Sequence, residues 1–382
     1  MTYPRPLQRT NNMDKYKTNS AFNKWFSPIN LEKLSILSKQ KIVDYNSYRK
    51  KLSFEAVLKL FLYGTNEEKE SLRDLSTSLI IKQLQKETHV ETISYSQLSR
   101  SLLALDTDVL VEIFQQLLLK VSQKTTPSKR NHLQLIDSST FSLSLKRHSW
   151  AKFRKSKSGI KLHLNLCFMD DATLYPTEFS ITNAREHDVN QLEVLVNQPE
   201  ATYVFDRGYL DFERLDQIHW DGYFFVTRIK KNTKVHVLES FDIPKDTRVN
   251  ILSDQHVFLG STTYLTSRFR LVTIQDEKGK QLAFVTNRFD LTAEEVAQAY
   301  KSRWQIELFF KHIKQHLTIK TFFSQGEKGV HNQLILAMIA TLLTTLVQLE
   351  TQTKQTIFQI KRLFRYLLFE PVEVLLKKIV PS

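Results

Sequence analysis

The sequence predicts an α/β protein with a helical N-terminal domain, a strand-rich central domain and a helical C-terminal region. From about residue 30 to 122, apolar residues recur at three- and four-residue spacing, which is typical of amphipathic helices. Runs rich in β-branched and aromatic residues, bounded by turn signals, follow and indicate strands. After Gly329 the pattern is again helical and strongly apolar. We therefore expect a helical domain over residues 1–125, an α/β domain over 130–325 and a helical region over 326–382.

Caps and breaks indicate the helices of the N-terminal domain. Ser53 is placed to cap FEAVLKLFLYG, and the polar TNEEKE separates that segment from SLRDLSTSLI. Helical spacing continues through YSQLSRSLLALDTDVLVEIFQQLLLKV. A helix-turn-helix over residues 54–105, with segment 94–103 reading DNA, fits this pattern, and so does plain bundle packing. The polar, Pro-containing SQKTTPSKRN at 122–131 predicts a linker.

The central domain begins with strand-like runs. HLQLIDSSTFSLSL, GIKLHLNLCFMD and TLYPTEFSIT indicate three successive strands. The helical segments VNQLEVLVNQ and LDFERLDQIH then alternate with the strands TYVFD and GYFFVTRI. Periodicity alone supports only an α/β or α+β domain. The order of three strands, helix, strand, helix, strand is the layout of a ribonuclease-H-like core.

A β-rich insertion is expected over residues 229–290. Its strand-like runs are TKVHVL, RVNILS, HVFLGSTTYLT, FRLVTIQ and LAFVTNRF, with DEKGK as a turn between the last two. The next helix starts near Thr292, whose hydroxyl can form a capping box with Glu295, and runs with a break as far as His316. Further on, LILAMIATLLTTLVQL is the most apolar stretch, and its Thr and Gln residues favour a buried helix over a membrane span.

Composition narrows the classes of function. Lys and Arg outnumber Asp and Glu by 54 to 40, a net charge of +14 that points to a polyanion such as nucleic acid, although basic proteins without nucleic-acid partners are common. The single cysteine, Cys167, excludes a disulfide framework and a thiolate zinc site and fits a reducing cytoplasm. The first twenty residues lack a signal-type apolar core, so export and membrane insertion are not expected. Nucleotide-binding glycine motifs are also missing, which disfavours ATP and dinucleotide chemistry.

Two aspartates stand at the ends of predicted strands. Asp137 follows LQLI and precedes SST, and Asp206 follows TYVF and precedes RGY. Each alone is more typical of a turn or a helix cap. On adjacent parallel strands, however, both carboxylates would meet at one sheet edge, where the active sites of α/β proteins usually lie.

One face of the helix AYKSRWQIELFFKHIKQHL combines an acid with cations. At about 100° per residue, a wedge of roughly 80° contains Tyr300, Arg303, Glu307, Lys311 and Lys314. The apolar stripe beside this wedge is made of Ile306, Phe310, Ile313 and Leu317. A solvated helix with an ordinary Glu–Lys pair would look similar. The two aspartates that precede the helix favour a functional site.

The helix carries the spacing Y-x2-R-x3-E-x6-K after the two motifs DSST and DRGY. With these motifs the sequence resembles the DDE transposases of the insertion-sequence-four family over about residues 130–320. The resemblance implies three catalytic, metal-binding acids, which are Asp137, Asp206 and Glu307. The rest of the signature would be Tyr300, Arg303 and Lys314. The segment between the second and third acids would hold the family's β insertion.

The reaction implied by this resemblance explains the need for carboxylates. In-line displacement at a phosphodiester requires one oxygen to be activated and another to be neutralised, and two cations about 3.5 to 4 Å apart can do both. Mg²⁺ (or Mn²⁺) prefers carboxylate, water and phosphate oxygens as ligands. We therefore expect two such ions, hydrolysis and strand transfer on double-stranded element ends and target DNA, and a homodimer in the synaptic complex. The expected location is the cytoplasm, in association with the nucleoid.

Two other functions fit the same residues. A ribonuclease-H-like nuclease or resolvase would use the same acids without strand transfer. A decayed DNA-binding relic would keep salt-sensitive DNA binding and lose cleavage. The β insertion and the Tyr-Arg-Glu-Lys helix favour the transposase.

Cations near the acids are the expected DNA contacts. Arg303, Lys311 and Lys314 would bind phosphates near the scissile bond, with Arg suited to bidentate contact. Tyr300 would contact the DNA there by a hydrogen bond or by stacking. Arg207 would orient Asp206 or bind phosphate. The segment KRHSWAKFRKSKSGIK predicts a DNA-backbone patch, with a solvated loop as the alternative. Its cations are Lys146, Arg147, Lys152, Arg154, Lys155, Lys157 and Lys161.

Two further features are given structural roles. Trp304 lies just outside the charged wedge, and packing is favoured over base stacking. In NAREHDVN, His187 and Asp188 are interpreted as a cap and packing feature rather than a metal site.

Overall fold

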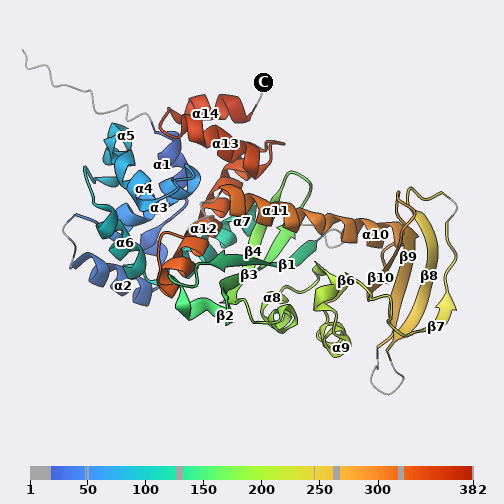
Figure 1. Ribbon diagram of the computed structural model, residues 1–382. Coiled ribbons are helices and arrows are strands. Elements are labelled where there is room, and N and C mark those ends of the chain that lie inside the picture. The colour runs from blue at the N-terminus through green and yellow to red at the C-terminus, as the bar shows by residue number, and fades with distance from the viewer. Residues whose placement is uncertain are drawn as a thin grey trace, which may run out of the picture.

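A ten-stranded sheet runs through the middle of the protein, and helices from both ends of the chain pack together at one end of it (Figure 1). This architecture comes from a computed structural model that describes residues 19–47, 49, 51–125, 132–244, 246–260, 267–316 and 322–380. The described chain is a mixed α/β protein, as the sequence predicts. The expected absence of a signal peptide and part of the expected linker fall on residues 1–18 and 126–131, outside the described residues.

The sheet combines a central part with an antiparallel extension. Its order is β2-β3-β1-β5-β6-β10-β9-β8-β7, and β4 pairs with β3. β1 is parallel to β5, which is parallel to β6, and the other pairings are antiparallel. The strands are β1 Leu133–Leu143, β2 Lys152–Arg154, β3 Lys157–Phe168, β4 Leu174–Asn183, β5 Thr202–Phe205, β6 Phe224–Arg228, β7 Val235–Ser240, β8 Asn250–Leu259, β9 Phe269–Gln275 and β10 Gln281–Thr286.

The expected β insertion continues the central sheet. β10 pairs with β6 through the register Phe284↔Arg228 to Thr286↔Val226. Most of the runs RVNILS and HVFLG, expected as two strands, lies in the single strand β8, whose pairing with β9 shifts register between Ile251 and Ser253. The rest of the second run, 261–266, lies outside the described residues. The DEKGK turn is confirmed, and Gly279 has a φ of +77°, a conformation that glycine adopts without strain.

Helices of the N-terminal part follow the expected pattern. They are α1 Ala21–Phe26, α2 Ile36–Ser47, α3 Phe54–Asn66, α4 Leu72–Thr77, α5 Lys82–Thr88, α6 Tyr95–Ala104 and α7 Thr107–Lys124. Ser53 caps α3 by accepting from the backbone N–H of Ala56, as predicted. α7 reaches Lys124, so the first residues of the expected linker are helical.

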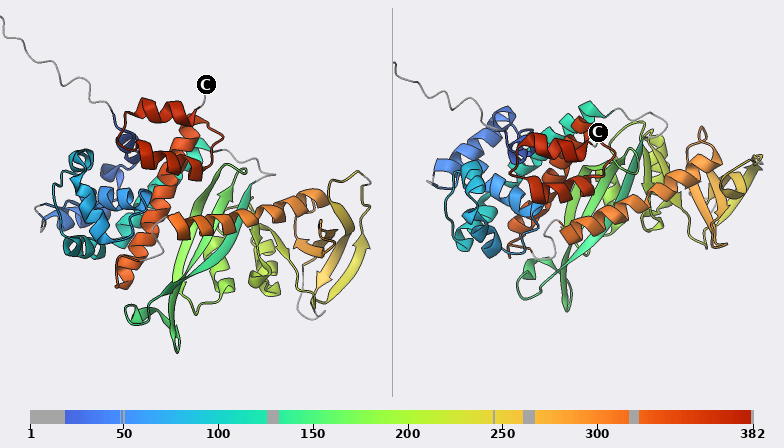
Figure 2. Two further views of the ribbon diagram at one scale, coloured as in Figure 1. Left: turned by 45° about the horizontal axis from the view of Figure 1, so that its top comes forward. Right: turned by 90° about the horizontal axis from the view of Figure 1, so that it is seen from above.

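The later helices lie on both faces of the sheet. They are α8 Leu192–Leu195, α9 Phe212–Trp220, α10 Ala293–Ser302, α11 Trp304–His316, α12 Glu327–Thr351, α13 Ile357–Leu367 and α14 Val372–Ile379. The helix expected over VNQLEVLVNQ is wrong in length, because a 3₁₀ turn at Asp188–Gln191 and the four-residue α8 replace it. α8 and α9 pack on one face, whereas α10 and α11 cross the other (Figure 2).

The C-terminal helices complete the main core. α12 packs against α7, α3, α6 and β4, and buried residues from both ends of the chain and from the sheet form one apolar cluster. α12 alone among the described helices is long and apolar enough to cross a membrane, but 83% of its most apolar window is buried inside the fold. This agrees with the expected core helix. The proposed domain boundaries at 125 and 325 remain predictions.

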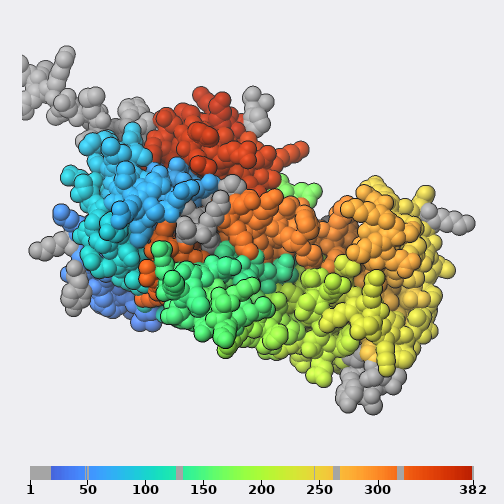
Figure 3. Space-filling view, in the orientation of Figure 1, coloured from blue at the N-terminus to red at the C-terminus, as the bar shows by residue number. Residues whose placement is uncertain are grey.

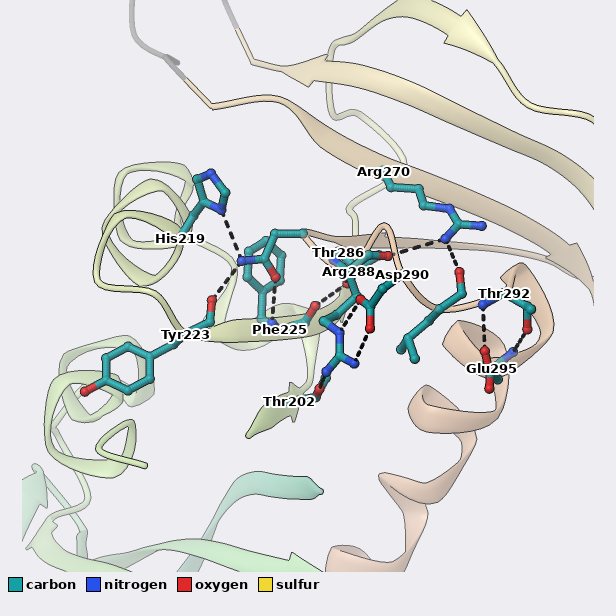
Figure 4. A network of polar contacts seen from close by, with 12 residues as sticks. Thr202, His219, Tyr223, Phe225, Arg270, Thr286, Arg288, Asp290, Thr292 and Glu295 are labelled. Atoms are coloured by element: carbon teal, nitrogen blue, oxygen red, sulfur yellow. Dashed lines mark hydrogen bonds and ion pairs between the residues drawn. The ribbon is translucent and has the colours of Figure 1, made fainter. Parts of the chain in front are cut away.

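Buried arginines join the antiparallel extension to the central strands. Arg288, after β10, makes a two-point ion pair with Asp290 and donates to Thr202 of β5 (Figure 4). Arg270 of β9 pairs with Asp254 at 2.6 Å and donates to the carbonyl of Leu291. These contacts surround the loop that leads into α10, so they fix where that helix starts.

Candidate active site between the central strands and the broken helix

The two strand-end aspartates lie side by side. In the parallel pair β1–β5, Ile136 is in register with Phe205, so the next residues are Asp137 and Asp206. Leu135 and Val204 belong to the main core cluster, on the face that α10 and α11 cover. Since side chains two residues apart share a face of a strand, both carboxylates project toward those helices.

The helix break brings the remaining residues to the aspartates. α10 ends at Ser302 and α11 begins at Trp304, so the expected break is confirmed and falls on Arg303. The capping box of Thr292 and Glu295 is also confirmed. α11 contacts β1, and the two helices lie exposed between the helical block and the antiparallel extension (Figure 3). Glu307 stands in the first turn of α11.

Arg303 links two of the acids, and Tyr300 contacts the third. The Arg303 guanidinium donates to Glu307 at 2.7 Å and lies 3.6 Å from Asp137. The Tyr300 hydroxyl donates to Asp206 at 3.3 Å, and its ring stacks near Phe284 of β10 with centroids 4.7 Å apart. Residues from β1, β5 and the broken helix therefore meet in one place.

Burial sets the electrostatics of this place. It raises the pKa of Asp137 to about 6, and the nearby carboxylates of Glu307 and Asp206 add to the increase, while the Ser138 N–H and Arg303 oppose it. Burial is the largest single influence on Arg303 and acts to lower its pKa, but the hydrogen bond to Glu307 and the charges of Tyr300, Glu307 and Asp137 together outweigh it, so the pKa is raised. The Asp137 carboxylate thus lacks full charge compensation, which a cation would supply.

An open groove of about 420 Å³ runs beside the acids. Its lining residues are Asp137, Ser138, Ser139, Glu307, Phe310, Lys311, Lys314 and Gln315. The Lys314 ammonium lies 5.1 Å from the centre of the Phe141 ring, and burial lowers the pKa of Lys314. Two cations of the expected wedge therefore face the same groove as two of the acids.

The donor set suits a hard divalent cation. Three carboxylates offer oxygen atoms only, which is what Mg²⁺ or Mn²⁺ prefers. Among the residues that the structure describes, no three His, Cys, Asp or Glu side chains are grouped as closely as a metal ion requires. Arg303 supplies the positive charge between Asp137 and Glu307 in this arrangement. The three carboxylates thus offer the oxygen donors that a divalent ion would need, with the Arg303 guanidinium lying between two of them.

Several expected DNA contacts lie on exposed elements outside the groove. Arg207 is exposed in the turn after β5. The β2–β3 hairpin projects from the body of the protein (Figure 2) and carries exposed cations. These cations are Lys152, Arg154, Lys155 and Lys157, and Lys146 and Arg147 are exposed just before the hairpin.

Three expectations need correction. Lys161 is no part of the exposed patch, because its side chain is 13% exposed and pairs with Asp188 at 3.0 Å. Trp304 is 57% exposed, so the packing interpretation is wrong and the ring is accessible to a base. Asp188 makes no cap bond at the 3₁₀ turn that it begins, and instead accepts from the Ser138 hydroxyl at 2.6 Å.

Sequence reasoning missed Ser138 and Tyr209. Ser138 donates its backbone N–H to Asp137 at 2.8 Å. Tyr209 is 2% exposed, and its hydroxyl has no hydrogen-bond partner in the described part of the chain. In the sequence, only their positions inside the motifs DSST and DRGY indicated that these two residues belong to the site.

Comparison with known proteins identifies the class. The sequence matches the transposase DDE domain family over residues 129–343, more than half of the chain. The protein therefore belongs to this family and is a DNA transposase, an enzyme that cleaves DNA and transfers strands. Enzymes of this family use divalent metal ions. Of the functions considered above, the comparisons favour the transposase over a nuclease without strand transfer and over a DNA-binding relic.

Three relatives are transposases by name. A probable transposase of the insertion sequence element IS5377 from Geobacillus stearothermophilus is 32% identical over 68% of each chain. A putative transposase, y4zB, from Sinorhizobium fredii is 32% identical over 61% of this chain and 65% of its own length. A putative transposase for the element IS4SA from Synechocystis is 28% identical over 74% of this chain and 80% of its own.

Proposed function

We propose that this transposase cuts and joins DNA with Asp137, Asp206 and Glu307 as the ligands of two Mg²⁺ (or Mn²⁺) ions. The observation that carries the proposal is the meeting of these acids, from β1, β5 and α11, around Arg303 and Tyr300. When bound, such ions activate the attacking oxygen and neutralise the leaving oxygen of a phosphodiester. The insertion-sequence-four family is the proposed subgroup.

The strand arrangement supports a ribonuclease-H-like core. Along the order β4-β3-β1-β5-β6, the first two pairings are antiparallel and the last two are parallel. This is the arrangement that the order of elements predicts for such a core. The acids would then lie at the edge where parallel strands end, the usual position for an active site in an α/β sheet.

Arg303 and Tyr300 would act on the substrate and on the acids. In the present arrangement Arg303 forms ion pairs with Asp137 and Glu307. A scissile phosphate offers the same guanidinium a two-point anionic partner, so we infer that Arg303 moves from the acids to the phosphate as the metal ions enter. Tyr300 would keep Asp206 oriented through its hydroxyl.

DNA would extend from the groove toward the exposed cations. Lys311 and Lys314 line the groove and would hold backbone phosphates close to the reaction. Arg207 and the hairpin residues Arg154, Lys155 and Lys157 would add contacts further along the duplex. A homodimer on paired DNA ends, in the cytoplasm and associated with the nucleoid, completes the proposal.

The test replaces single acids and separates binding from chemistry. Asp137→Asn and Glu307→Gln should abolish metal-dependent cleavage of an end-containing duplex while leaving DNA affinity nearly unchanged. Asp221→Asn, at an exposed position on the far side of the sheet after α9, is the matched control and should cleave normally. Incubation of a 3′-hydroxyl end with target plasmid should give joined product. Cleavage that survives either acid substitution would remove that residue from the site.

A further inference from the structure

We propose that Asp188 is a positioning residue for Asp137 and acts through Ser138. The inference rests on the proposed function, because it concerns how one proposed metal ligand is held. Asp188 lies 51 residues after Asp137 in the sequence and outside the motifs that carry the family resemblance. Its carboxylate nevertheless accepts a hydrogen bond from Ser138, the residue next to Asp137, and the backbone N–H of Ser138 donates to Asp137.

Ser138 is the link in this chain. Its hydroxyl donates to Asp188 Oδ1 at 2.6 Å, and its backbone N–H donates to Asp137 Oδ1 at 2.8 Å. One residue therefore holds both carboxylates, one through its side chain and one through its backbone. A short hydroxyl–carboxylate bond is charge-assisted and stronger than a neutral one, so it restricts the rotation of Ser138.

Asp188 anchors Ser138 from the face of the sheet opposite to the site. Successive side chains of a strand point to opposite faces. Ile136 belongs to the core cluster on the α8 and α9 face, so Ser138, two residues later, points to that face as well. Asp137 points toward α11. Asp188 thus supports Asp137 from the opposite face of the sheet and leaves the proposed metal-binding side of Asp137 open.

The Lys161 ammonium and the imidazole of His163, both on β3, lie beside Asp188, and burial lowers the pKa of His163 to about 4, so only Lys161 brings a positive charge. Lys161 Nζ lies 3.0 Å and His163 Nδ1 lies 3.6 Å from Asp188 Oδ1, and these side chains are 13% and 0% exposed. Lys161 also donates to the carbonyl of Glu186 at 2.8 Å, and His163 contacts the Thr182 hydroxyl at 2.9 Å. Ser138 is in register with His163 across the β1–β3 pair, so the anchor belongs to the sheet itself.

The buried hydroxyl of Tyr209 lies in the same layer. Burial raises the pKa of Tyr209, the charges of Asp188 and Asp137 add to this effect, and the Ser138 side chain opposes it. Its oxygen has no hydrogen-bond partner among the described residues.

A residue that orients a metal ligand without contacting the metal affects metal affinity more than it affects the stability of the fold. Loss of such a partner typically weakens metal binding by about 10- to 100-fold, because the ligand is no longer oriented. In the full-length protein, we expect Ser138→Ala to weaken Mn²⁺ binding about 10-fold in titrations followed by electron paramagnetic resonance. Ser138→Thr keeps the hydroxyl and should bind Mn²⁺ as the parent does. Thermal unfolding in EDTA should be similar for both variants.

A double-mutant cycle tests the role of Asp188. Asp188→Ala should weaken Mn²⁺ binding as Ser138→Ala does, and the double variant should bind no more weakly than either single one, because both remove the same link. Ser142→Ala, an exposed position on the same strand, and Glu193→Gln, which breaks a surface ion pair with Arg214, are controls that should bind normally. Asp188→Ala also removes the ion-pair partner of Lys161. If the Asp188→Ala variant fails to fold, the result for Ser138→Ala decides the test.

The outcomes separate this inference from the proposed function. Normal Mn²⁺ affinity in Ser138→Ala, with weakened affinity in Asp137→Asn, would overturn the positioning role and leave the metal site intact. Equal weakening in Ser138→Thr and Ser138→Ala would also overturn it, because the hydroxyl would then be irrelevant. Unchanged affinity in Asp137→Asn would overturn the metal site and, with it, the role of Asp188.

Discussion

Replacing Asp137 with Asn should stabilise the metal-free protein at neutral and alkaline pH. Burial raises the pKa of Asp137 from its ordinary 3.8 to about 6, although Arg303 lies 3.6 Å away. One pKa unit corresponds to about 1.4 kcal/mol, so a shift of about two units makes the ionised carboxylate cost up to about 3 kcal/mol. Solvent at this partly exposed side chain reduces the cost, and we expect about 1 to 3 kcal/mol.

The sign of the pH dependence follows from proton binding. Below about pH 4 the carboxyl of Asp137 is protonated in both the folded and the unfolded state and costs nothing. Between about pH 4 and 6 the folded state keeps a proton that the unfolded state has lost, so the free energy of unfolding falls as pH rises. Above about pH 6 the full cost is present. Asn resembles the neutral acid and avoids this loss.

Urea unfolding in EDTA at pH 4 and at pH 8 measures the effect. The stability of Asp137→Asn relative to the parent should increase by about 1 to 3 kcal/mol between these two pH values. Asp221→Asn should show no such increase, because its carboxylate is exposed. Mg²⁺ should stabilise the parent more than Asp137→Asn, since the parent alone keeps all three acids. A pH-independent difference between parent and variant would refute the reasoning.

Two other changes test the DNA-facing cations. Arg303→Lys keeps the positive charge but loses the planar guanidinium, so we expect the rate of single-turnover cleavage to fall about 10- to 100-fold. This corresponds to the loss of one charged hydrogen bond of roughly 1.5 to 3 kcal/mol. Cleavage at the parental rate would exclude a two-point phosphate interaction. Lys155→Ala combined with Lys157→Ala should reduce the slope of log affinity against log salt by roughly 1.8, about 0.9 for each phosphate that is no longer neutralised. An unchanged slope in filter-binding titrations would show that the hairpin does not bind DNA.

Local patterns in the sequence predict much of the site. Asp137 and Asp206 follow short apolar runs, and the parallel pairing of β1 with β5 makes them neighbours, as expected. Helical spacing places Tyr300, Arg303 and Glu307 on one face, and the break at Arg303 keeps them together. These features depend on residues close in sequence and on alternation within single strands, which a sequence displays directly.

Interactions between segments that are distant in the sequence account for the predictions that were wrong or missing. Asp188 reaches Ser138 across 50 residues, and nothing near HDVN distinguishes such an acid from a helix cap. In the sequence, Lys161 stands among the cations of the predicted DNA-backbone patch. In the structure, the alternation of side chains along β3 and the position of the 3₁₀ turn at Asp188–Gln191 place it beside Asp188. Trp304 borders the charged wedge on the side away from the apolar stripe, and whether another element covers it depends on tertiary packing.

The antiparallel extension takes part in assembling the site. Because β10 pairs with β6 and Arg288 joins Asp290 to Thr202 of β5, the extension is tied to the strand that ends at Asp206. The loop after Arg288 leads directly into α10, whose last turn carries Tyr300. The position in space of Glu307 relative to Asp206 is therefore set by β6, β10 and this buried arginine. The more distant β7 and β8 do not pair directly with the central strands. We therefore expect changes in length to be better tolerated at β7 and β8 than at the junction, because the junction fixes the approach of Glu307 to the two aspartates.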